Sequence, residues 1–174
     1  MLEAEHRIIA LIVGAAPVLA SRLEEGAPAD NALMTGIVEF MRVYADQCHH
    51  GKEEELLFPV LGEKGVPMHG CPIGGLISEH IRGRALVKGL EEAAAAMQKN
   101  EADTAARKQL VANLRGIAEL YPGHIWREDY MLFPMTDKIL SEEEQVSLYE
   151  AFQQVDKRIG HQVIDRLVAF AKSI

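Results

Sequence analysis

Two segments of the chain, residues 49–59 and 124–134, repeat one pattern of chemically active side chains. When the segments are aligned on their shared Leu-Phe-Pro ending, His49 matches His124 and Glu53 matches Glu128. A His and a Glu four residues apart lie on the same face of a helix. Imidazole and carboxylate groups without a thiolate suit iron, manganese or zinc. Each segment is therefore a candidate metal-binding unit.

The first segment contains a rival pair, because His50 and Glu54 are also four residues apart. At roughly 100° per residue, the apolar residues before this segment centre on a helix face that includes neither His49 nor His50 cleanly. Periodicity does not choose between the two pairs, whereas the register of the internal repeat favours His49 with Glu53. Glu54 is then either an acceptor that orients an imidazole or a solvated side chain.

The elements that must position these residues are helices, because helix formers dominate and Gly and Pro cluster at a few breaks. Helices are expected over about residues 4–24, 30–61, 73–99, 101–139 and 141–172. Asp30 is the expected cap of the second helix, and Ser141 begins a capping box for the fifth. The sequence predicts an all-α fold with one domain over residues 1–174. The first four helices form an antiparallel four-helix bundle over about residues 4–139, and the C-terminal helix packs alongside.

The apolar stripes of the bundle helices carry polar residues. His6 lies on the stripe of the first helix, His80 on that of the third, and His124 with Glu128 on that of the fourth. Burying an ionised carboxylate without a partner is strongly unfavourable, and the pattern shows no basic partner. Bound cations would remove this conflict. Two glutamates able to bridge, with several histidines around them, favour a dinuclear site in the core.

These residues resemble the hemerythrin-like family of His-His-Glu cation-binding domains. The resemblance spans about residues 5–134 and rests on Glu5-His6, His49-His50-x-x-Glu53, Glu79-His80 and His124-x-x-x-Glu128, with both Leu-Phe-Pro tails. It implies a non-haem di-iron centre that is bridged by two carboxylates and an oxo or hydroxo group. Zinc and manganese are the alternative metals on ligand chemistry. The resemblance makes His6, His49, His80 and His124 terminal ligands, Glu53 and Glu128 bridges, and His50 a fifth histidine ligand.

The chain departs from the oxygen-carrying members of this family. Leu76 stands where they have a second histidine on the third helix, and His124 is followed by Glu128 four residues later instead of by an Asp five later. The extra imidazole instead follows His49. This resembles the bacterial His-His-Glu proteins and the hemerythrin domain of an iron-sensing ubiquitin ligase.

The resemblance implies a protein that binds or senses O2 or a related small oxidant such as peroxide or nitric oxide. One alternative is an iron store or donor, for example in iron–sulfur repair. Another is a di-iron enzyme that turns over peroxide or nitric oxide, and a third is a metal-free interaction bundle. A homo-oligomer and an unidentified protein partner stay open.

The composition argues against other classes of protein. A net charge of −8 disfavours binding to nucleic acid or to an anionic membrane surface. We expect no apolar run near the length of about 20 residues that a membrane span needs. The first residues lack the basic region of a signal peptide. Cys48 and Cys71 are the only cysteines and have no CxxC spacing, so a cytoplasmic location is expected.

Overall fold

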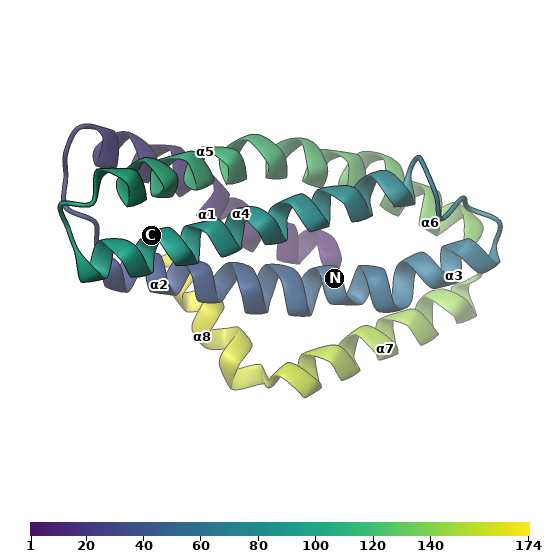
Figure 1. Ribbon diagram of the computed structural model, residues 1–174. Coiled ribbons are helices and arrows are strands. Elements are labelled where there is room, and N and C mark those ends of the chain that lie inside the picture. The colour runs from purple at the N-terminus through teal and green to yellow at the C-terminus, as the bar shows by residue number, and fades with distance from the viewer.

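The computed structural model describes all 174 residues, which form helices and their connections without a strand. Four helical segments run in alternately opposite directions to form the bundle (Figure 1). The first segment is α1 (Leu2–Glu24), and the third is α4 (Ile73–Lys99). The second contains α2 (Asn31–Phe40), η1 (Met41–His50), η2 (Glu53–Leu57) and α3 (Phe58–Glu63). The fourth contains α5 (Thr104–Arg127), η3 (Glu128–Leu132) and α6 (Phe133–Ile139). The predicted all-α bundle is confirmed.

Side-chain caps fix the start of two helices, as the sequence predicts. The Asp30 carboxylate accepts a hydrogen bond from the backbone N–H of Leu33 at 3.0 Å. Ser141 and Glu144 form a complete capping box at the start of the C-terminal region. Such caps satisfy backbone N–H groups that the first turn of a helix leaves without partners.

The C-terminal region contains two helices, so the prediction of a single one is wrong. α7 (Glu142–Ile159) and α8 (His161–Lys172) meet at Gly160, whose φ is 100°. Side chains other than glycine rarely adopt this backbone conformation, and the chain changes direction there. α7 contacts η1 and η2, whereas α8 turns back against α1 and α2 (Figure 1).

Three stretches of the bundle, η1, η2 and η3, are π-helical. They include or directly adjoin the repeated His-x-x-x-Glu units. A π-helix closes its hydrogen bonds over one more residue than an α-helix, so the rotation between neighbouring side chains differs. An angle of about 100° per residue therefore does not describe which side chains share a face in these stretches. This difference explains why an apolar stripe drawn with that angle includes neither His49 nor His50.

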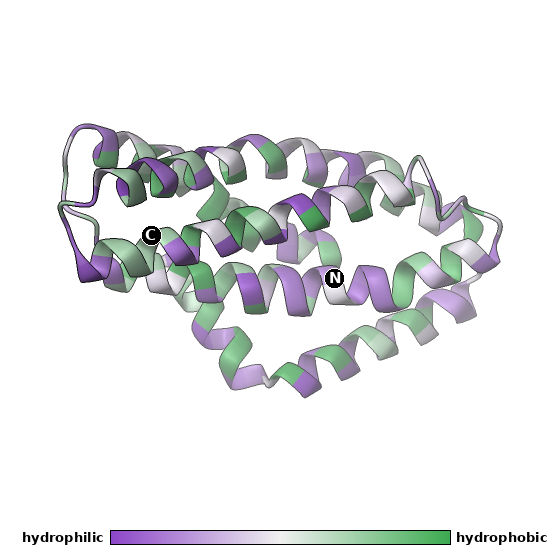
Figure 2. Ribbon diagram, in the orientation of Figure 1, coloured by the Kyte–Doolittle hydropathy of each residue, from purple (hydrophilic) through white to green (hydrophobic).

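The site lies between two apolar clusters of the core. The larger cluster includes Ile9, Val87 and Leu114, and the smaller includes Leu57 and Leu132. Hydrophobic and hydrophilic residues alternate along the helices (Figure 2), as expected when each helix turns one face inward. In every segment of the bundle, buried histidine or glutamate residues stand between the residues of one cluster and those of the other. These residues form a polar layer between the two clusters.

α1 is 23 residues long and apolar enough, by length and composition, to cross a membrane. The expectation that no apolar run reaches this length is therefore wrong for α1. The result is weak evidence for a membrane span, because a core helix passes the same test. In this fold α1 packs against α5 and brings His6 into the core.

The turn between α7 and α8 gives a test of the fold. We expect Gly160→Ala to lower the free energy of unfolding by about 1–3 kcal/mol, because alanine is strained at this φ. Gly14→Ala is the matched control: Gly14 is exposed within α1, and an added Cβ meets nothing within 4 Å. The control should instead raise stability by about 0.5–1 kcal/mol. Urea unfolding measures both, and equal effects would show that Gly160 is not required by its backbone conformation.

Candidate metal centre

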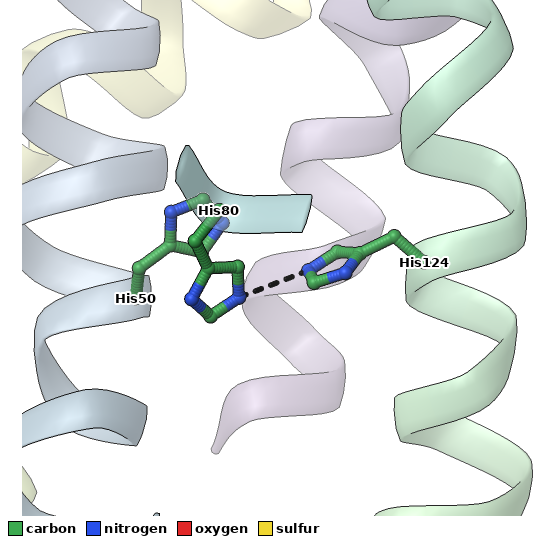
Figure 3. A group of neighbouring side chains, drawn as sticks. All are labelled: His50, His80 and His124. Atoms are coloured by element: carbon green, nitrogen blue, oxygen red, sulfur yellow. Dashed lines mark hydrogen bonds between the residues drawn. The ribbon is translucent and has the colours of Figure 1, made fainter. Parts of the chain in front are cut away.

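The seven ligand candidates predicted from the sequence all lie buried in the polar layer. They are His6, His49, His50, Glu53, His80, His124 and Glu128. Their donor atoms form two groups, one of His50, His80 and His124, and one of His6, His49, Glu53 and Glu128. Within each group the atoms lie within 4.8 Å of one another, which suits two ion positions. Figure 3 shows the three rings of the first group, with His80 and His124 joined at their ring nitrogens.

Most of these donor atoms have no hydrogen-bond partner in the protein. The unpaired atoms are Nε2 of His6, His49 and His50 and both carboxylate oxygens of Glu53 and Glu128. The remaining two, Nε2 of His80 and His124, face each other at 3.2 Å. Buried polar atoms are almost always paired, because an unpaired one loses its hydration without compensation. Their convergence is therefore what a site for cations requires.

Each histidine is oriented by a carboxylate at the opposite ring nitrogen. The Nδ1 atoms contact Asp129 for His6 (2.6 Å), Glu5 for His49 (3.0 Å), Asp46 for His50 (3.2 Å), Glu54 for His80 (2.6 Å) and Glu79 for His124 (3.0 Å). An ionised carboxylate can only accept, so Nδ1 carries the proton and Nε2 offers its lone pair. Carboxylates commonly orient metal-binding histidines in this way.

The structure separates the two candidate registers of the first repeat. His49 and His50 both point Nε2 into the pocket, and the fully buried Glu53 points both of its carboxylate oxygens there. Glu54 points elsewhere: its Oε1 contacts Nδ1 of His80 at 2.6 Å and the Arg84 guanidinium at 2.9 Å. Glu54 therefore orients an imidazole and offers nothing to the pocket.

Glu53 and Glu128 both lie between the two parts of the centre. Oε1 of Glu53 lies 3.7 Å from Nε2 of His49, and its Oε2 lies 3.5 Å from Nε2 of His80. Oε1 of Glu128 lies 3.7 Å from Nε2 of His80, and its Oε2 lies 3.2 Å from Nε2 of both His6 and His124. Carboxylates placed in this way can bridge two ions.

Burial and neighbouring charges shift the histidine pKa values in both directions. Burial lowers the pKa values of His49, His50 and His124, whereas those of His6 and His80 rise because the nearby carboxylates outweigh burial. Burial, reinforced by the neighbouring imidazoles, lowers the pKa of His50 to about 3, although Asp46 opposes the shift. Burial and then the Glu128 carboxylate raise the pKa of Glu53 well above its usual range. Burial alone would raise the pKa of Glu128 as well, but the neighbouring histidines, His6 and His80 foremost, outweigh burial and lower it. Of the two carboxylates, Glu53 is therefore the one that more readily holds a proton.

The two halves of the bundle use the same scheme. Glu5-His6 on α1 corresponds to Glu79-His80 on α4, just as His49 and Glu53 correspond to His124 and Glu128. The basic residue before each bridging glutamate completes the match, since Lys52 pairs with Glu5 and Arg127 with Glu79. The counterpart of His50 is Ile125, so the extra imidazole belongs to one half alone.

Sequence reasoning missed several of the supporting residues. Asp46, Asp129 and Arg84 hold ligand side chains or their partners, yet none of them stands out as a candidate ligand in the sequence. Asp129 had a signal, because an acid follows the glutamate in both repeats. His69 and His161 are exposed, and neither belongs to either ligand group.

Cys48 adjoins His49 but points away from the centre. Its thiol donates a hydrogen bond to the Asp156 carboxylate at 3.3 Å. Burial raises the pKa of Cys48 to about 12, with the nearby Lys52 opposing and Glu5 and Asp156 adding to the shift. The group is therefore a protonated thiol and a poor nucleophile near neutral pH.

The raised pKa of Glu53 predicts that metal binding releases a proton. We expect Zn(II) binding to displace protons from the centre, Glu53 among the groups that lose one, so Zn(II) affinity falls as the pH is lowered. Calorimetric titration in buffers of different ionisation enthalpy measures this release. A binding heat independent of the buffer would contradict the prediction.

The different orientations of two adjacent glutamates predict different effects of one substitution. Glu53→Gln removes a charge shared by both donor groups, so we expect the purified variant to lose bound metal. Glu54→Gln alters only the partner of His80, so metal stoichiometry should persist with affinity about 10- to 100-fold weaker. Elemental analysis after dialysis distinguishes the variants, and the reverse order of losses would contradict the assignment of Glu53.

Comparison with known proteins agrees with this geometry. A model of the Hemerythrin HHE cation binding domain matches residues 1–136, which include both repeats and all seven candidate ligands. No curated protein and no solved structure matches the chain. The family match confirms the resemblance expected from the sequence and supports metal binding. The chain belongs to the hemerythrin HHE cation-binding family.

Proposed function

We propose that this protein holds two iron ions and binds or senses O2 or a related small oxidant. The observation that carries the proposal is the convergence of unpaired, buried Nε2 and carboxylate atoms into two groups. One group would bind an ion through His50, His80 and His124, and the other through His6 and His49. Glu53 and Glu128 would be shared, because the oxygens of each lie near histidines of both groups.

The donor set supports iron. Only imidazole and carboxylate donors face the pocket, a combination that suits iron and also manganese and zinc. Cys48 is turned toward Asp156 and supplies no thiolate. Two bound iron ions would supply the electrons needed to reduce a small oxidant, which zinc cannot do.

The two positions differ in a way that supports binding of a small ligand. The His6–His49 position has two histidines where the other has three, so it would have one protein ligand fewer if Glu53 and Glu128 were both shared. The Phe133 ring stacks on His6 with a centroid separation of 5.6 Å. Phe133 also lines a cavity of about 230 Å³ with Leu2, Leu57 and Phe152. The apolar ring of Phe133 beside His6 would suit an uncharged diatomic molecule better than an anion.

The chain's own residues keep the site ready for this role. The five carboxylates at Nδ1 fix the rings and place the proton of each neutral imidazole on Nδ1, so that Nε2 faces the pocket with its lone pair. Burial removes water from the bridging glutamates, whose exposed fractions are both 0%. The apolar clusters on either side shield the centre from bulk solvent.

The test is anaerobic loading with Fe(II), followed by metal analysis and optical spectra under argon and then air. We expect two iron ions per chain and a new near-ultraviolet or visible band on exposure to O2. Glu53→Gln should give neither. The proposal fails if purified protein remains metal-free after loading and its melting temperature is unmoved by Fe(II).

The same spectra separate the more specific functions. A band that disappears on removal of O2 supports reversible carriage or sensing. A band that decays once to a di-ferric product, with turnover of added peroxide or nitric oxide, supports an enzyme. Transfer of the iron to an apo iron–sulfur protein, without a stable oxygenated band, supports a store or donor.

A further inference from the structure

A fully buried lysine connects the metal centre to the C-terminal helices. The exposed fraction of Lys52 is 0%, and its Nζ lies 2.5 Å from Oε1 of Glu5 and 2.5 Å from Oδ1 of Asp156. Glu5 belongs to α1 and Asp156 to α7. An ammonium without solvent contact needs compensating charge, and here two carboxylates from different helices provide it.

This ion pair is continuous with a metal-binding histidine. While Oε1 of Glu5 accepts from Lys52, Oε2 of the same carboxylate lies 3.0 Å from Nδ1 of His49. The path from α7 to the centre therefore runs from Asp156 through Lys52 and Glu5 to His49. The Lys52–Glu5 and His49–Glu5 links are charge-assisted hydrogen bonds, a class that is shorter and stronger than neutral hydrogen bonds, and Asp156 joins Lys52 as an ion pair.

Glu5, Cys48 and Asp156 also lie close enough to form a third cation-binding group. The Lys52 ammonium contacts both carboxylates of this group at 2.5 Å. The Lys52 ammonium thus takes the place that a metal cation would have between Glu5 and Asp156.

The other half of the bundle has the same arrangement, except that its basic residue has no second carboxylate partner. Arg127 pairs with Glu79, whose second oxygen lies 3.0 Å from Nδ1 of His124. Arg127 is 42% exposed, and Glu79 is the only carboxylate paired with it. Water can therefore satisfy the Arg127 guanidinium. Lys52 has no such access, and the extra carboxylate comes from α7, beyond the family match at residues 1–136.

We propose that Asp156 is a positioning residue for the metal-binding His49, acting through Lys52 and Glu5. Asp156 shares the charge of the Lys52 ammonium, so Glu5 keeps enough negative charge to hold the Nδ1 proton of His49. Without Asp156, Lys52 would neutralise Glu5 alone and weaken its hold on the imidazole. α7 thereby tunes the His6–His49 position selectively. The inference rests on the two metal positions of the proposed function.

The test is Co(II) titration of the metal-free, full-length protein. Asp156→Asn keeps the shape of the side chain and removes its charge. We expect it to weaken one of two binding steps, by less than the about 10- to 100-fold loss that removal of a direct partner of a ligating histidine causes. Asp156→Glu should restore most of the affinity. Arg158→Ala is the matched control, because Arg158 lies on the same helix and forms only an exposed pair with Glu55.

A second measurement reports on the proposed link directly. In metal-free protein labelled with ¹⁵N-histidine, the Nδ1–H resonance of His49 should shift in Asp156→Asn and return in Asp156→Glu. The resonance of His124, oriented by Glu79, should stay in place in both variants. Circular dichroism of each variant checks that the bundle is folded.

The outcomes distinguish this inference from the proposed function. If wild-type protein binds two Co(II) ions and Asp156→Asn matches it in both measurements, Asp156 has no positioning role and the two-ion centre stands. Equal losses in Asp156→Asn and Arg158→Ala would also overturn the inference, since they would show that any disturbance of α7 suffices. Wild-type protein that binds fewer than two ions would overturn both proposals.

Discussion

Burial of negative charge in the middle of a helical bundle is the constraint on which the rest of this structure depends. Glu53 and Glu128 have no exposed surface, and their oxygens find no hydrogen-bond donor. A free-standing bundle gains nothing from such groups, since apolar residues of similar size would pack at lower free-energy cost. The helices therefore trade stability of the metal-free protein for affinity toward cations, and the apolar clusters on either side supply the compensating stability.

Charge alternates outward from this centre in shells. Imidazoles surround the bridging carboxylates, acidic side chains such as Asp46 and Glu79 hold the imidazoles, and basic residues such as Arg84 and Arg127 hold the acids. The acids pair with the imidazoles and the basic residues pair with the acids, whereas the bridging carboxylates at the centre stay without a hydrogen-bond donor. The order of the rings thus depends on contacts that end at the protein surface, where water completes the scheme.

Many of the candidate ligands could be predicted because they stand at fixed spacings in the repeat of residues 49–59 and 124–134. The Leu-Phe-Pro register selected Glu53 over Glu54, and the structure places only Glu53 in the pocket. The partners of the ligands were harder, because their contacts cross between helices: His6 with Asp129 spans 123 positions of sequence. The π-helical turns were also missed, since hydrophobic periodicity assumes a constant angle per residue. The break at Gly160 was missed for a related reason: the apolar spacing continues across it.

The near-symmetry of the two halves has a consequence for how the chain is assembled. Neither donor group belongs to one half: His50 joins His80 and His124 from the other hairpin, and Glu128 joins His6 and His49. Each ion would therefore bind side chains from both helical hairpins and hold the two hairpins together. A hairpin alone holds an incomplete set of donors, so occupancy of the centre reports that the two hairpins have met in register.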